Sequence, residues 1–265
     1  MQNIILLFYL LAFSSLTYAC YDKEEFNLHK TFLQNIKTKK QITDAEIANS
    51  YVQITDQCKF KHSHFKSIYE NMTSIQKFSP EFALSITNKL LTKDIDFSNL
   101  QKILLQPLPK NILELKTDLA IDLITALSKS KAPHLDHRSV LSDFDLVAND
   151  CTAKLPEYKK NCQTLTAKYF IRSLNEEKNK LALFEHYKKV KTFVYESIKT
   201  KANFNFEYYG FIFTVLNTGQ NGIETFINIF NSMQNDNSVG IEKKFNIALK
   251  AANNTYQQSR KKDIK

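Results

Sequence analysis

Apolar residues recur every three or four positions along most of this chain, which is the spacing of an amphipathic α-helix. In the segment 23–38, one face carries Phe26, His29, Phe32, Leu33 and Ile36. The same spacing is found in the segments 65–75, 80–90, 100–104, 110–128, 140–147, 156–170, 175–200, 223–230 and 241–252. The pattern therefore predicts about ten helices of ordinary length.

Several helix starts carry recognisable capping residues. Thr43-Asp44-Ala45-Glu46 is a capping box, which predicts a helix that runs toward Cys58. Ser79 precedes Pro80 and predicts a start at 80, because proline is favoured at the first helical position. Ser98 is expected to cap the next helix, and Asp136 or Ser139 a later one.

Two segments near residue 210 are harder to assign. In 203–216 the aromatic residues alternate with period two, which fits either a hairpin or a single buried helix. The chain has only 4 Gly and 5 Pro in 265 residues, so few positions suit a tight β-turn and the helix is favoured. The sequence Thr218-Gly219-Gln220-Asn221-Gly222 is expected to be a turn.

These patterns predict an all-α fold with helices joined by short loops into antiparallel hairpins. No repeat of fixed length persists, so an irregular bundle and a short α-solenoid-like array are both compatible with the sequence. A single helical domain is expected over 20–258, with a candidate internal boundary near 129–135. Residues 259–265 are expected to form a basic flexible tail.

The first nineteen residues have the features of a secretory signal peptide. An uncharged start leads into an apolar run from Ile4 to Phe13, which is too short to span a bilayer. Thr17-Tyr18-Ala19 is an acceptable cleavage site, so Cys20 is expected to be the first mature residue. The protein is therefore expected to be secreted or extracytoplasmic. A membrane-anchored lipoprotein acylated at Cys20 is the alternative, but the residue three places before the cysteine is Thr17 rather than an apolar one.

The mature chain contains four cysteines, Cys20, Cys58, Cys151 and Cys162. An even number in an oxidising compartment indicates two disulfides, for which three pairings exist. The pairing favoured here is Cys20 with Cys58 and Cys151 with Cys162. Acylation of Cys20 would leave an odd number of thiols, which argues against the lipoprotein.

The formal net charge is +9, from 36 basic and 27 acidic residues. The basic residues occur in short dispersed runs, such as Lys188-Lys189-Val190-Lys191, and lysine far outnumbers arginine. Solvated helix faces explain this pattern better than a nucleic-acid surface, which favours arginine. No nucleic-acid partner is expected, and glycine-rich phosphate-binding motifs are absent from the sequence.

Candidate catalytic and metal-binding residues are few. His134 and His137 have the spacing of one helical turn and are a weak candidate metal site with Asp136, although exposed loop histidines are the commoner explanation. His62 and His64 would point apart on a helix. Asp143, Asp145 and Asp150 form an acidic stretch without the spacing of a calcium loop. No nucleophile motif is found, and no cofactor is expected.

Two sequons, at Asn71 and Asn253, would be glycosylation sites only in a eukaryote. With no recognisable catalytic motif, the chain is expected to be a secreted helical protein that binds another protein. One alternative is a carrier of an apolar small molecule in a core lined by Phe and Tyr. Another is an enzyme or metal-binding protein that uses His134 and His137.

Overall fold

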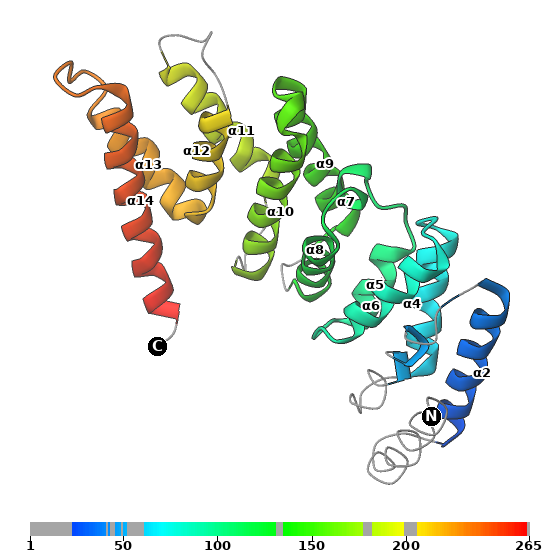
Figure 1. Ribbon diagram of the computed structural model, residues 1–265. Helices are drawn as coiled ribbons and strands as arrows, with labels where there is room; N and C mark the ends of the chain where they lie inside the picture. The colour runs from blue at the N-terminus through cyan, green and yellow to red at the C-terminus, as the bar shows by residue number, and fades with distance from the viewer. Residues whose placement is uncertain are drawn as a thin grey trace, which may run out of the picture. The chain divides into compact units, whose positions relative to one another are not determined.

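The computed structural model describes residues 23–40, 42, 46–48, 50–51, 61–130, 135–176, 182–198 and 206–263. Within these residues the regular secondary structure consists of thirteen helical elements and includes no strand, so the all-α prediction is confirmed (Figure 1). The chain divides into two compact units, Met1–Leu108 and Pro109–Lys265. The division falls at Leu108, and residues 129–135 lie inside the second unit.

The first unit contains α2 (Lys23–Lys40), α4 (His62–Ser74), α5 (Pro80–Leu91) and α6 (Phe97–Leu104). Helix α4 packs against the other three. The predicted inner face of the first helix is confirmed for His29, Leu33 and Ile36, which are all buried. Residues 46–48, 50 and 51 are helical, and the remainder of the segment expected to run from Thr43 to Cys58 lies outside the described residues.

Side-chain caps fix two helix starts in the first unit. The Ser79 hydroxyl accepts a hydrogen bond from the Phe82 N–H, as the sequence predicted for α5. Helix α6 is capped by Asp96, whose carboxylate accepts from the Asn99 N–H at 3.0 Å, so the prediction of Ser98 as the cap was wrong. Asp and Ser are about equally good N-caps, and the earlier of the two residues starts the helix here.

A buried glutamine holds the chain after α6. The side chain of Gln76 donates to the carbonyls of Leu104 and Gln106 and accepts from the Leu108 N–H at 2.8 Å. These three backbone groups have lost their helical partners because Pro107 interrupts the helical pattern. One amide side chain therefore satisfies polar groups that would otherwise be costly to bury.

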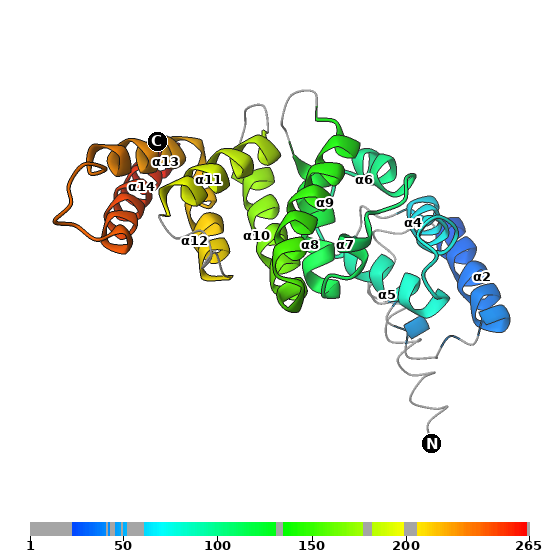
Figure 2. The ribbon, with the colours of Figure 1, turned by 90° about the horizontal axis from the view of Figure 1, so that it is seen from above.

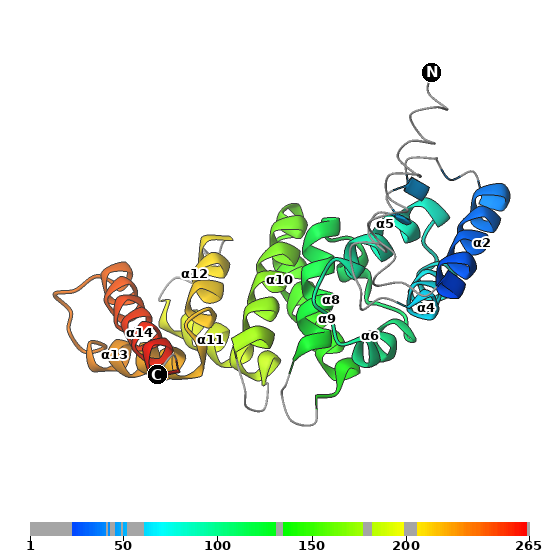
Figure 3. The same ribbon diagram turned by 90° about the horizontal axis from the view of Figure 1, so that it is seen from below.

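The second unit contains nine helical elements. In chain order these are α7 (Lys110–Leu113), α8 (Thr117–Lys129), α9 (His137–Lys154), the 3₁₀ turn η1 (Pro156–Tyr158), α10 (Lys159–Glu176), α11 (Leu183–Ser197), α12 (Phe206–Leu216), α13 (Gly219–Ser232) and α14 (Ile241–Asp263). Both α8 and α9 pack on α10, and α11 packs on α9 and α12 (Figure 3). At the end of the chain, α13 packs on α12 and most extensively on α14 (Figure 2).

Predictions for this unit were partly right. Asp136 caps α9 through the Arg138 N–H, and residues 206–216 form a helix rather than a hairpin. The single helix expected over 110–128 is wrong, because the chain leaves the helix at Glu114 and restarts at Thr117. The last helix continues to Asp263, so most of the segment expected to be a tail is helical.

The predicted turn at 218–222 is wrong beyond Thr218, since α13 begins at Gly219. Gly219 has φ +69°, a conformation that favours glycine. Gly222 lies inside the helix, and a Cβ added there would come within 2.2 Å of the Thr218 hydroxyl and 3.3 Å of the Ala252 carbonyl oxygen. The second glycine therefore leaves room for the Thr218 side chain and for α14, and does not form a turn.

Replacing Gly222 with alanine is expected to lower the free energy of unfolding of the second unit by about 2 kcal/mol, because Thr218 is buried and cannot move away freely. Chemical denaturation followed by circular dichroism would measure the change. Gly210 is the matched control, since a Cβ added there meets nothing within 4 Å. Gly210→Ala in α12 should be neutral or stabilising by up to about 1 kcal/mol, and equal losses in both variants would contradict the packing argument.

Candidate functional site

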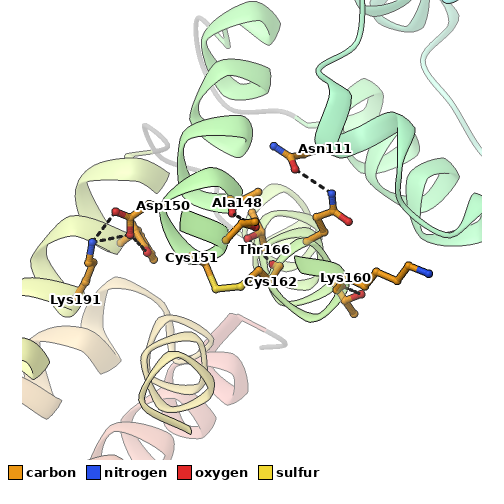
Figure 4. Close-up of a disulfide and its surroundings, with 12 residues drawn as sticks. Asn111, Ala148, Asp150, Cys151, Lys160, Cys162, Thr166 and Lys191 are labelled. Atoms are coloured by element: carbon orange, nitrogen blue, oxygen red, sulfur yellow. Dashed lines mark hydrogen bonds and ion pairs between the residues drawn. A yellow bond between two sulfur atoms is a disulfide. The ribbon is translucent and has the colours of Figure 1, made fainter. Parts of the chain in front are cut away.

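The chemically densest part of the described chain surrounds a disulfide between Cys151 and Cys162 (Figure 4). The disulfide joins the C-terminal part of α9 to the first turns of α10, across the corner made by η1. Both cysteines are fully buried. This half of the predicted pairing is confirmed. Asp150 and Lys191 lie on one side of the bridge and Asn111 on the other (Figure 4).

Asp150, next to the disulfide, joins α9 to α11 through a charged cluster. The Lys191 ammonium donates to both carboxylate oxygens, at 2.7 Å and 2.6 Å. The Tyr187 hydroxyl donates to one of the same oxygens. Tyr187 and Lys191 are one helical turn apart on α11, so a single carboxylate holds one face of that helix. We call Asp150, Tyr187 and Lys191 the carboxylate cluster.

The two phenols near this carboxylate are held in their neutral form. Burial, followed by the hydrogen bond to Asp150, raises the pKa of Tyr187 far above its usual value. Burial and the Asp150 charge also raise the pKa of Tyr209, which projects from α12. Neither hydroxyl can act as a base near neutral pH. The Asp150 carboxylate accepts three hydrogen bonds, from Lys191 and Tyr187, and therefore serves as a structural contact between α9 and α11.

On the other side of the disulfide, amide side chains link α7, α9 and α10. The Asn111 amide group donates to Asp145 at 2.6 Å and to Asn149 at 2.8 Å, and its carbonyl accepts from Gln163 at 2.9 Å. Gln163 also donates to Glu114, at 2.8 Å. Asn111 and Gln163 are both almost fully buried. We call these five residues the amide network.

Glu114 connects the amide network to the surface. Its carboxylate pairs with the Lys159 ammonium at 2.7 Å, at the start of α10. The hydrogen bond from Lys159, followed by the one from Gln163, lowers the pKa of Glu114. Glu114 follows the last residue of α7, where the helix predicted over 110–128 is interrupted. Its contacts with Lys159 and Gln163 therefore hold the chain to α10 at the point of interruption.

A third cluster joins α10 to the last helix. The Arg172 guanidinium donates to Glu176 at 2.8 Å and to the Leu216 carbonyl at 3.2 Å, and it lies over the Tyr256 ring at 4.5 Å. The Tyr256 hydroxyl donates to the same Glu176 carboxylate. Cation–π contact and ion pair therefore act together between helices far apart in the sequence.

In all three clusters the charged and polar groups serve to connect helices. A buried polar group that is hydrogen-bonded fixes the register of the elements around it, and an unpaired one is costly. These clusters supply hydrogen bonds between α7, α9, α10, α11 and α14. The role that these contacts show is structural.

The other predicted site residues are placed less completely. Cys20, Cys58 and His134, which belong to the second predicted disulfide and to the two-histidine metal site, lie outside the described residues. His137 is the first residue of α9 and is half-buried. Among the residues that the structure describes, no three His, Cys, Asp or Glu side chains are grouped as a metal would require.

His62 and His64 lie on α4 rather than in an exposed loop. Their side chains diverge, as the spacing predicted. The His64 ring stacks on Phe97 with centroids 3.5 Å apart, while His62 contacts His29 on α2 at 3.3 Å between the two Nδ1 atoms. The sequence did not indicate the pairing of His62 with His29, because the partners come from separate helices.

The two sequons lie on helices. Asn71 is half-buried near the end of α4, next to the fully buried Met72. Asn253 is exposed on α14. Of the two, Asn253 is the more accessible.

The aromatic residues near 210 pack against one another. Phe211 and Phe226 lie with ring centroids 5.6 Å apart, and Phe230 and Phe245 lie at 4.8 Å. The last three rings are buried. Rings in this arrangement form part of the contact between α12, α13 and α14, as expected of a Phe-rich core.

The sequence missed Lys191 and Asn111 as inter-helix contacts. Lys191 was assigned to a solvated basic run, but it lies four residues after Tyr187 and so shares a helical face with it. This spacing of two polar groups on a partly buried helix could have indicated a shared partner. Asn111 gave no signal, since its partners lie on other helices.

None of the described helices is long and apolar enough to cross a membrane.

Comparison with protein families, with curated proteins and with solved structures finds no match for this chain.

Proposed function

We propose that this chain is a secreted, disulfide-stapled helical protein that acts by binding another protein through the outer faces of its packed helices. The observation that carries the proposal is the use of the polar groups in the second unit. Asp150, Asn111 and Arg172 each bind side chains or carbonyls of other helices. Because these buried polar groups hold the helices together, we assign the binding role to the outer surface of the protein.

The disulfide supports the extracytoplasmic part of the proposal. Disulfides persist in oxidising compartments and are rare in the reducing cytosol. The bridge between Cys151 and Cys162 lies beyond the reach of solvent, which suits a permanent structural link. It agrees with the apolar leader that precedes Cys20 in the sequence.

Intact mass of the complete sequence, expressed in a eukaryotic secretory host, tests the compartment. The expected product appears in the medium, begins at Cys20 and is lighter by four hydrogens than its reduced form. Retention of residues 1–19, or an acyl mass on Cys20, would contradict the proposal. Glycan mass at Asn253 would be removed enzymatically before the measurement.

Native mass spectrometry of the protein isolated from the organism that makes it tests the binding role. The expected species is a complex with a second polypeptide, which re-forms when the two purified chains are mixed. A stoichiometric apolar small molecule would overturn the proposal in favour of a carrier. A stoichiometric metal ion that is lost in the His137→Ala variant would overturn it in favour of the metal site.

A further inference from the structure

The contact between α2 and α4 in the first unit contains a pair of histidines that face each other. The Nδ1 atoms of His29 and His62 are 3.3 Å apart. At this distance one nitrogen carries a proton and donates it, and the other accepts with its lone pair. The contact therefore requires that at least one of the two rings is neutral, because two protonated rings would present a donor to a donor.

The His29 ring lies in an aromatic environment. It is fully buried and meets Phe65 edge-on, with centroids 4.6 Å apart, and Tyr51 at 6.0 Å. Among the described residues, its Nε2 atom has no hydrogen-bond partner. A charged imidazolium would place a second donor in this environment, where an unsatisfied charge is expensive.

We propose that the His29–His62 contact is an acid-sensitive latch, which holds α2 on α4 at neutral pH and releases α2 as the surroundings fall below about pH 6. The released state is favoured in acid because both imidazoles can take up protons there. The attached state cannot accept them without breaking the contact or burying a charge. The latch is separate from the proposed binding role and depends only on these two helices.

Burial, with a smaller contribution from His62, lowers the pKa of His29 to about 3. Burial also lowers the pKa of His62. A base whose pKa is depressed in the attached state binds more protons when released, so the attachment is stable above the ordinary histidine value of 6.5. It weakens as the pH falls from that value toward 3.

Other titratable groups surround the two histidines and also affect the pH dependence of the contact. Glu25 on α2 accepts the His62 backbone N–H at 2.8 Å. Lys66 and Glu70 on α4 act on the His62 ring with opposite signs, and Tyr51 meets His29. The Glu25 carboxylate also joins α2 to α4 through this hydrogen bond, so the test must separate its contribution from that of His29.

Hydrogen exchange in the full mature chain measures the latch directly. Protection factors of α2 amides, corrected for intrinsic exchange, are compared between pH 7.5 and pH 5.0, with α8 in the other unit as reference. From the pKa of His29 alone, protection of α2 is expected to fall by about 30-fold, while α8 changes much less. An unchanged α2 would overturn the proposal.

Two variants assign the effect. His29→Leu replaces the imidazole with an apolar side chain of similar size and leaves Glu25 in place. It should abolish most of the pH dependence of α2 protection. His64→Gln, on the same helix but stacked on Phe97, should leave the pH dependence as in the wild type. If His29→Leu retains the full 30-fold response, the latch is not His29 and the proposal fails.

If His29→Leu does not fold, the wild-type protein still provides a test. Nitrogen chemical shifts of the His29 ring should report a neutral imidazole at pH 5.0 in every molecule in which α2 is attached. A charged His29 ring in the attached state would overturn the proposal.

Discussion

Replacement of Asp150 by alanine is expected to lower the free energy of unfolding of the second unit by about 3 kcal/mol. The carboxylate accepts hydrogen bonds from Lys191 and from the buried Tyr187 hydroxyl. Its removal leaves the hydroxyl without this acceptor and the ammonium without its counter-charge. Both partners keep some access to solvent, with 24% of the Lys191 side chain and 34% of the Asp150 side chain exposed, which limits the loss. Chemical denaturation followed by circular dichroism measures the change.

The partners of Asp150 provide the controls. Lys191→Met keeps the aliphatic stem and removes the charge, and the double variant Asp150→Ala/Lys191→Met should be less destabilised than Asp150→Ala alone, since no unpaired ammonium remains. Glu185→Ala on the same helix breaks an exposed pair with Lys188 and should cost no more than about 0.5 kcal/mol. Strict additivity of Asp150→Ala and Lys191→Met would show that the two residues do not interact.

The polar clusters of the second unit complement its apolar packing by fixing how the helices align. Apolar packing fills the interior, but similar Leu, Ile and Phe faces would tolerate a shift of one helix along another. The carboxylate cluster joins α9 to α11, and the amide network joins α9 and α10 to α7, through hydrogen bonds that a shift of one helix along another would break. Hydrogen-bonded polar residues therefore set the register that the apolar faces leave open.

The fold class was predictable because helical periodicity is a local property. The inner face of α2 and the caps at Ser79 and Asp136 followed from residues within one or two turns. The α12 helix was predictable from the scarcity of glycine, which removed the hairpin alternative. The helix face and the caps were inferred from neighbouring residues, and the α12 helix from the composition of the whole chain.

Two of the errors have a different cause, since each involves a partner that is distant in the sequence. Gly222 resembles a turn residue, but its role is explained by the buried Thr218 side chain and the Ala252 carbonyl of α14, both of which a Cβ would meet. The 110–128 pattern has helical spacing throughout, but Glu114 at the break binds Lys159 and Gln163 from α10. Contacts of this kind leave no mark in a single sequence, because periodicity records which face is buried but not what lies against it.

The candidate site was less predictable than the fold for the same reason. The pairing of Cys151 with Cys162 could be predicted, since the two residues are close in sequence and flank a helix start. The partners of Asp150 are some forty positions away. The His29–His62 contact likewise joins two helices that the sequence presents as independent.

Removal of the disulfide by the paired change Cys151→Ala/Cys162→Ala is expected to lower the free energy of unfolding of the second unit by about 3 kcal/mol. The bridge spans a sequence separation of 11, and closing a loop of that size restricts the unfolded chain by this amount. Alanine suits both positions because the side chains are fully buried and a hydroxyl would need a partner. The change leaves Cys20 and Cys58 in place.

The mechanism of that loss can be separated from a local packing defect. If the bridge acts on the unfolded chain, its removal should increase the dependence of unfolding on denaturant concentration, because more surface becomes exposed on unfolding. Hydrogen exchange in α4, in the first unit, should be unchanged and serves as an internal reference. If the free energy of unfolding equals that of the wild-type protein, the bridge does not stabilise the corner between α9 and α10. In that case the carboxylate cluster and the amide network on either side of it must hold these helices by themselves.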